Sequence, residues 1–258
     1  MKGEHRRNFV KLLQQAARKT NLWDVFSDFL HVAATAISNS DRWHLATDVK
    51  TWQQREDEYL AVIKKYDKEE QQLFPQMLAE LTLEMDDCVS DGHFEDVLGS
   101  VFHELELHNK WRGQFFTPQD ISDFMGKIVV DNNEKGSQLR QDIDLYGFCS
   151  INEPCCGAGA MLYGFLNAFR EAGFNHSKQV LITACDLDER CVWMTYIQCS
   201  LYGTPAIVLQ QNTLSLETFG KPWYSPVYVV DGWQWKRRRA HDIELQEREY
   251  RDFLEILG

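Results

Sequence analysis

A cluster of small residues between an apolar run and a helical pattern constrains the fold of this chain more than any other feature. The stretch from residue 148 to 162 reads FCSINEPCCGAGAML, with Gly157 and Gly159 in the cluster. Glycine has no Cβ, so the backbone of such a turn can lie close to a ligand at the carboxyl end of a parallel strand. An ordinary tight turn between a strand and a helix gives the same letters, because the dinucleotide-binding fingerprint requires a third glycine.

The composition is typical of a folded protein. Hydrophobic residues make up 44% of the 258 residues and charged residues 26%. No apolar run approaches the roughly 18–20 residues of a membrane span, and the N-terminus lacks the apolar segment of a secretory signal, so we expect no membrane association and a cytoplasmic location. The formal net charge of −12 disfavours a stand-alone DNA-binding protein, although a local basic patch can still exist.

The cysteines and histidines show no metal-binding pattern. The chain has seven cysteines and no Cys-x-x-Cys pair. This favours buried thiols in a reducing compartment, and we predict neither a disulfide framework nor a metal site. The histidines of the N-terminal region also lack metal-ligand spacing, namely His31, His44, His93, His103 and His108.

Residues 1–110 are predicted to form an all-helical domain, because apolar residues recur at helical spacing. Thr20 or Asn21 can cap a helix that starts near residue 22. Further helices are predicted at about 46–66, 71–85 and 94–105, with a helix start at Asp67 and a turn at 91–92. Thr117 can cap another helix whose first residue is Pro118, and the free N–H groups of that end can bind an anion.

Residues 111–258 are predicted to form a second domain in which strands and helices alternate. Strands are expected at 145–151, 179–184, 206–210 and 227–230. Helices are expected at about 160–172 and 191–201 and from 236 to 257, and a loop is expected at 131–141. Such alternation indicates right-handed β-α-β units and a parallel sheet, so the fold class is α/β.

In such a sheet the ligand lies at the carboxyl ends of neighbouring strands. Asp186 follows the second predicted strand, roughly 30 residues after the glycine turn, where a carboxylate can accept two hydrogen bonds from a ribose diol. Leu187 beside it can cover a flat base. The alternative for Asp186 is a helix-capping aspartate.

Three stretches in this order resemble one family. They are GQFFTP at 113–118, EPCCGAGAML at 153–162 and ACDLD at 184–188, and the segment DVLG at 96–99 precedes them. Together they resemble the methylation subunits of type I restriction–modification systems and related N6-adenine DNA methyltransferases. The resemblance extends over about residues 94–214. It implies a Rossmann-like class I methyltransferase core with S-adenosylmethionine as cofactor, and a truncated parallel sheet with about four strands of seven.

The resemblance also implies roles for individual residues. Thr117, with Phe116 and Pro118, would lie by the methionine end of the cofactor. Glu153, followed by Pro154, would meet the cofactor's amino group. Gly157 and Gly159 would let the backbone pass close to the cofactor. Asp186 would bind the ribose hydroxyls, Leu187 would pack on the adenine, and Asn212 would accept a hydrogen bond from the adenine amino group.

The sequence departs from the family at the catalytic motif. The family carries Asn/Asp-Pro-Pro-Tyr/Phe after the fourth strand, where it binds the amino group of a flipped adenine and stacks on the base. No such tetrapeptide occurs here, and its position falls at 231–234, where Asp231 can act as acceptor and Trp233 can stack. The segment 221–224, KPWY, is closer in letters but precedes the predicted strand.

Three hypotheses remain open. The chain is an adenine-N6 DNA methyltransferase, or a catalytically inactive relative that binds the cofactor and acts as a partner or regulator, or a methyltransferase for another substrate. DNA is the expected partner, with target recognition supplied by another subunit in a homo- or hetero-oligomer. The basic run at 236–239 is either a solvated helix start or a phosphate contact.

Overall fold

The computed structural model describes residues 3–41, 47–105, 117–130 and 138–257. The N-terminal region folds into helices α1 (Glu4–Ala16), α2 (Leu22–Ser38), α3 (Val49–Ile63), α4 (Lys68–Gln71), α5 (Leu73–Ser90) and α6 (Val97–Glu104). The remainder contains α7 (Gln119–Val130), α8 (Gln138–Tyr146), β1 (Cys149–Glu153), α9 (Ala160–Glu171), α10 (His176–Gln179), β2 (Val180–Asp186), α11 (Glu189–Leu201), β3 (Ala206–Asn212), β4 (Glu217–Tyr224), α12 (Pro226–Val230) and α13 (Trp233–Leu257).

The predicted helices of the N-terminal region are confirmed, and their ends follow from local capping. The Asn21 side chain accepts a hydrogen bond from the Asp24 N–H and starts α2. Asp67 starts α4 in a reciprocal capping box with Glu70. Helix α5 carries Pro75 in its first turn, where a missing N–H breaks no helical bond.

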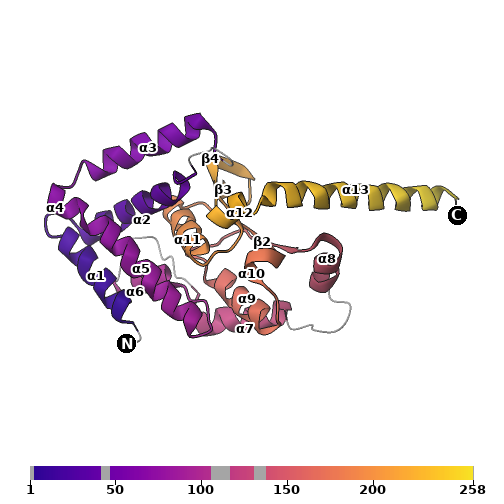
Figure 1. The fold of residues 1–258 in the computed structure, drawn as a ribbon, viewed down its shortest axis with the longest axis horizontal. Helices are drawn as coiled ribbons and strands as arrows, with labels where there is room; N and C mark the ends of the chain where they lie inside the picture. The colour runs from indigo at the N-terminus through magenta and orange to yellow at the C-terminus, as the bar shows by residue number, and fades with distance from the viewer. Residues whose placement is uncertain (1–2, 42–46, 106–116, 131–137, 258) are drawn as a thin grey trace.

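The sheet has four strands among the described residues, in the order β1-β2-β3-β4. Strands β1, β2 and β3 are parallel, as predicted, whereas β4 runs antiparallel to β3. The carboxyl ends of β1, β2 and β3 therefore meet at one edge of the sheet. This is a truncated Rossmann-like core, and it lies between the N-terminal helices and the projecting helix α13 (Figure 1).

The two faces of the sheet are covered differently. One face, with Ile182 and Val208, belongs to a large core that also includes residues of α9, α11 and the N-terminal helices. The other face, with Leu181 and Ile207, packs against a small cluster built mainly from α12 and the start of α13. Beyond this cluster α13 extends away from the body of the molecule (Figure 1).

The last predicted strand is wrong. Residues 226–230 form helix α12, because Pro226 at its first position has a φ that suits a helix start; Ser225 precedes it, but its hydroxyl bonds Thr204 and Ala206 and does not cap the helix. The fourth strand is instead β4, which pairs with β3 as a hairpin and was not predicted. The first strand is also shifted: residues 145–146 belong to α8, and β1 begins at Cys149.

The predicted loop at 131–141 is wrong where it can be compared. Residues 138–141 begin α8, and residues 131–137 lie outside the described part of the chain. Helix α8 ends at Gly147, which has a φ of 84° and so allows the chain to leave the helix in the left-handed region.

Helices α7 and α9 cross with their backbones in contact. A Cβ built on Gly126 of α7 would lie 2.2 Å from the carbonyl oxygen of Gly164 in α9. A Cβ on Gly164 would lie 2.2 Å from the backbone of Ser122. Only glycine at both positions permits this approach. The opposite side of α7 carries Ile121, Phe124, Met125, Ile128 and Val129, each at least 39% exposed.

The N-terminal helices pack directly on the sheet region. The Arg55 guanidinium donates to the carbonyl oxygens of Lys221 and Pro222 and lies 3.7 Å from the centre of the Trp223 ring. His31 of α2 stacks on Trp193 of α11. The predicted boundary between residues 110 and 111 lies outside the described residues. In the part of the chain that the structure describes, we find no helix long and apolar enough to cross a membrane.

Candidate cofactor site

The glycine turn after β1 is held by backbone and side-chain hydrogen bonds from β2 and α11. Gly157 and Gly159 have φ values of 54° and 101°, in the region that favours glycine. The Cys156 N–H donates to the carbonyl oxygen of Cys185 at the end of β2. The Thr195 hydroxyl of α11 donates to the carbonyl oxygen of Gly157 at 2.9 Å. The turn is therefore fixed before any ligand binds.

Asp186 lies directly against this turn. One carboxylate oxygen accepts the Gly157 N–H at 2.9 Å, and the other accepts the Asp188 N–H at 2.9 Å. Burial raises the pKa of Asp186, and these two backbone N–H groups oppose the shift. An ionised carboxylate offers about four acceptor positions, so acceptor capacity remains on both oxygens.

The capping alternative for Asp186 is wrong, because Asp188 fills that position. The Asp188 side chain accepts the Arg190 N–H and also pairs with the Arg190 guanidinium. Asp186 thus ends β2 and contacts the glycine turn, while its neighbour two residues on starts α11. Leu187 between them is 59% exposed.

The end of β3 closes the same edge of the sheet. The Thr213 hydroxyl donates to the carbonyl oxygen of Pro154 at 2.5 Å, which ties the end of β3 to the end of β1. The Asn212 amide oxygen accepts the N–H groups of Leu214 and Ser215 and so shapes the next turn. The Asn212 amide oxygen, to which the family resemblance gives the role of accepting from an adenine amino group, therefore already accepts two backbone hydrogen bonds.

Two buried side chains, Asp96 and Gln198, support the glycine turn, and the sequence pattern did not indicate this contact. The Gln198 side-chain N–H₂ donates to Asp96 at 3.0 Å and to the carbonyl oxygen of Ala158 at 2.9 Å. Asp96 also accepts the Gly99 N–H at the start of α6. Burial raises the pKa of Asp96 to about 6, against the opposing effect of these two donors. Asp96 three residues before Gly99 is a spacing that could have indicated the cap of α6. No local sequence feature indicated a role for Gln198.

The start of α7 is tied to the same pair. Gln119 accepts the Asp96 N–H and donates to Asp123 in its own helix. Thr117 and Pro118 directly precede Gln119, and their predicted place by the cofactor stays a prediction. Phe116 lies outside the described residues. Glu153, at the end of β1, accepts the Cys155 N–H at 3.2 Å.

The placement of the catalytic motif rested on the strand that the structure lacks. Trp233 is the first residue of α13 and is fully buried, with its ring packed edge-on against Phe148. This burial does not support the predicted stacking of Trp233 on an incoming base, which stays a prediction. Asp231 is exposed and lies between α12 and α13, not at the end of a strand. The segment 221–224 lies within β4.

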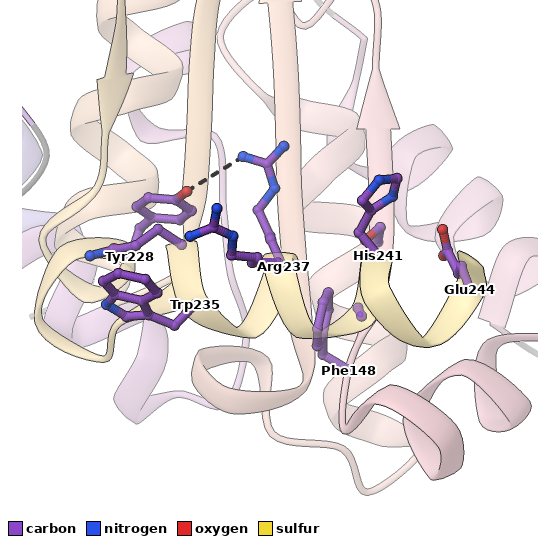
Figure 2. Close-up of a pocket in the computed structure, with 10 residues that line it drawn as sticks. Phe148, Tyr228, Trp235, Arg237, His241 and Glu244 are labelled. Carbon is purple, nitrogen blue, oxygen red and sulfur yellow. Dashed lines mark hydrogen bonds between the residues drawn. The ribbon is translucent and has the colours of Figure 1, made fainter. Parts of the chain in front are cut away.

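A separate hollow of about 660 Å³ lies on the other face of the sheet. It is lined by the start of β1, α12 and the first turns of α13 (Figure 2). Its lining includes Tyr228, Trp235, Arg237, Arg238 and His241, and the Arg237 guanidinium donates to the Tyr228 hydroxyl at 3.4 Å. Because it includes Ser150 rather than the strand ends, this basic groove is distinct from the glycine turn.

The parallel strands, the glycine turn and the carboxylate at the end of β2 define a protein with a truncated Rossmann-like core and a candidate cofactor site at its strand ends. Residues 93–233 match the family described as N-6 DNA Methylase, over more than half of the 258 residues. The chain belongs to the N-6 DNA Methylase family.

A solved structure gives a weaker likeness. It is the crystal structure of the type I restriction-modification system methyltransferase subunit from Streptococcus thermophilus, with 15% sequence identity and a TM-score of 0.32. The match covers 77% of this chain and 56% of that chain, so this chain spans little more than half the length of that subunit. No curated protein matches this chain.

Proposed function

We propose that this chain binds S-adenosylmethionine at the carboxyl ends of β1, β2 and β3 and contributes to adenine-N6 methylation of DNA. The observation that carries the proposal is the contact between Asp186 and the Gly157 N–H at adjacent strand ends. It places a carboxylate beside bare backbone, which is the arrangement that ribose hydroxyls require. Membership of the N-6 DNA Methylase family supports the choice of cofactor.

The residues at this edge fit the parts of that cofactor. Asp186 keeps acceptor positions for the ribose diol, and the exposed Leu187 side chain offers an apolar surface to the adenine. Glu153, next to Pro154, offers a carboxylate to the amino group. Thr117 and Pro118 directly precede α7 and are the residues proposed to lie by the methionine end. Gly157 presents its backbone N–H at this edge, where it contacts Asp186, whereas Gly159 lets the turn pack closely on Tyr163. When bound, the cofactor supplies an electrophilic methyl group.

Transfer to an adenine amino group requires a hydrogen-bond acceptor and a stacking surface beside the cofactor's methyl group. Trp233 is buried and Asp231 does not follow a strand. These observations favour a second candidate function, in which the chain binds the cofactor and assists a catalytic partner.

The basic groove is the proposed contact with DNA. Lys236, Arg237, Arg238 and Arg239 lie in the first two turns of α13. Cations at a helix N-terminus oppose the helix dipole, so helix stability does not explain them. Among the described residues, no ion pair joins any of them to a carboxylate. The exposed Trp235 ring and the dipole both favour a phosphate-bearing partner here.

Calorimetric titration with S-adenosylmethionine tests the cofactor. We expect binding in the micromolar range by the wild-type protein. Absence of binding at millimolar cofactor would contradict the proposal. If the cofactor binds, transfer of a labelled methyl group to DNA separates the two candidate functions. Transfer by the chain alone, or with a recognition subunit that has no methyltransferase activity of its own, supports the enzyme. Transfer only with an added catalytic subunit supports the assisting role.

Fluorescence anisotropy with a 20-base-pair duplex tests the groove. The double variant Arg237→Ala/Arg238→Ala should bind the duplex at least tenfold more weakly and show a smaller salt dependence, because each phosphate that is no longer neutralised lowers the salt slope by about 0.9. Arg248→Ala is the matched control, since Arg248 is an exposed arginine further along the same helix. Equal losses in both variants would exclude a specific role for the groove.

A further inference from the structure

We propose that Cys88, His93 and Glu95 bind a single divalent transition-metal ion, with Zn²⁺ the best fit. The three residues lie at the end of α5 and in the turn that leads to α6, outside the cofactor site. One ligand atom from each lies within 4.8 Å of the other two. The inference does not depend on the proposed function.

Two of the three distances between the ligand atoms are close to those of tetrahedral coordination. The Cys88 Sγ lies 3.8 Å from the Glu95 Oε2, and the His93 Nε2 lies 3.6 Å from the same oxygen. Zinc bonds of about 2.3 Å to sulfur and about 2.0–2.1 Å to nitrogen and oxygen give ligand-to-ligand distances of about 3.3–3.6 Å. The remaining pair, the Cys88 Sγ and the His93 ring nitrogen, lies within 4.8 Å, so coordination requires these two side chains to approach each other by up to about 1.2 Å.

The turn itself holds the ligands in place. The His93 N–H donates to the carbonyl oxygen of Cys88 at 3.0 Å, and Gly92 has a φ of 91° that suits the end of a helix. This geometry brings a thiol and an imidazole from positions five residues apart to the same side of the turn. The set combines sulfur, nitrogen and oxygen donors, which favours Zn²⁺ over Mg²⁺ or Ca²⁺.

Glu95 is oriented by a neighbour that leaves one oxygen available. The Arg6 guanidinium donates to the Glu95 Oε1 at 2.5 Å, so the Oε2 faces Cys88 and His93. Hydrogen bonds of this kind commonly orient metal-binding carboxylates. Arg6 brings a positive charge, but it also pairs with Glu84, and the two carboxylates leave a net charge of −1. Loss of the Cys88 proton to solvent on metal binding makes this −2, which a divalent cation balances.

Solvent access and the surrounding charge also suit a cation. The site borders a hollow of about 610 Å³ whose lining includes Asp87, Asp91 and Glu104. A fourth coordination position can therefore be filled by water from this side. The Glu95 backbone exchanges two hydrogen bonds with the Tyr202 hydroxyl of the sheet region, and the next residue is Asp96. A bound metal would stiffen the segment that positions Asp96 beneath the glycine turn.

Titration of the chelator-treated full-length protein with Co²⁺ tests the proposal. We expect one equivalent to produce a near-ultraviolet thiolate-to-cobalt band together with visible bands, and Zn²⁺ to abolish both by displacement. Cys88→Ser should remove the thiolate band. His93→Gln, at a partly exposed position, should weaken binding at least tenfold with little effect on folding.

Cys155→Ser is the matched control, because Cys155 is an exposed free cysteine remote from this turn. It should leave the spectrum and the affinity unchanged. Absence of a band in the wild-type protein would overturn the proposal. So would a thiolate band that survives in Cys88→Ser but disappears in Cys155→Ser, and so would unchanged affinity in His93→Gln.

Discussion

The ends of β2 and β3 lie at the same edge of the sheet but use their polar side chains differently. Asp186 uses one hydrogen bond on each oxygen to join the glycine turn and its own loop, and it keeps acceptor positions toward the edge. Asn212 turns its single amide oxygen inward on the loop that leads to β4. One strand end keeps acceptor capacity that the proposed cofactor can use, and the acceptor at the other is occupied by the hairpin loop. A polar residue at the carboxyl end of a parallel strand is thus not sufficient to indicate a binding role.

The largest effect is expected for Asp186→Ala. The variant should bind S-adenosylmethionine about 30- to 100-fold more weakly, because two charge-assisted hydrogen bonds to the ribose are removed. Calorimetry gives the affinity. Asp188→Ala is the control: it removes the cap of α11 and lowers the melting temperature, but the affinity should change less than threefold. Similar affinity losses in the two variants would erase the distinction between them.

The next effect concerns Asp96, which supports the glycine turn through Gln198. Because its folded pKa of about 6 lies above the unfolded value, the native state binds more protons between about pH 4 and 6, and stability falls as pH rises through this window. The contribution is on the order of 2–3 kcal/mol. Asp96→Asn keeps an acceptor for both donors and should remove this part of the pH dependence.

Urea unfolding of both proteins from pH 4 to pH 7 measures the difference. Other carboxylates contribute equally to the two curves, so only the gap between them reports Asp96. Parallel curves across the whole range would mean that the carboxyl of Asp96 titrates normally in the folded protein.

A smaller effect is expected when the turn itself is changed. Gly159→Ala should lower the free energy of unfolding by about 2 kcal/mol, because φ is 101° and a Cβ would lie 2.5 Å from the Tyr163 hydroxyl. Gly173→Ala is the matched control, with a φ of 86° and nothing within 4 Å of the new Cβ. It should cost about 1 kcal/mol. The excess in Gly159→Ala measures the close packing of the turn.

The smallest effect is expected for Asn212→Ala. Its amide oxygen already accepts two backbone N–H groups, so the affinity for S-adenosylmethionine should fall less than threefold, while the hairpin loses about 1 kcal/mol of stability. Calorimetry and urea unfolding give the two values. A tenfold loss of affinity would show that the amide contacts the cofactor after all, and the ends of β2 and β3 would then be equivalent.

The sequence was most informative where local signals agree with one another. The apolar runs before Asp186 and Asn212 and the helical pattern between them predicted β2, α11 and β3 correctly. The pattern of residues 227–230 predicted a strand, because β-branched residues favour strands. The preceding Ser225-Pro226 pair starts a helix and outweighs this preference. Strand β4 contains Gly220 and Pro222, which weaken any strand pattern, so only pairing with β3 defines it.

The same limit applies to the site. Gly157, Gly159 and Asp186 could be predicted to lie together, because the carboxyl ends of adjacent parallel strands coincide. The supporting contact of Gln198 with Asp96 joins residues 102 positions apart, and no local pattern encodes it. The direction of the Asn212 amide also depends on the turn that follows, which the hairpin sets. The letters therefore indicate where a ligand can bind, and tertiary packing decides which side chains remain available to it.

The contact between Gly126 and Gly164 fixes the positions of α7 and α9 relative to each other. Helix α9 begins at the glycine turn, and α7 begins just after Thr117, so the two ends of the proposed cofactor site belong to a single rigid unit. Movement of one end relative to the other would therefore require the two helices to separate at this contact. A methyl group added at either glycine would force the two helices apart, and this would move one end of the proposed site away from the other.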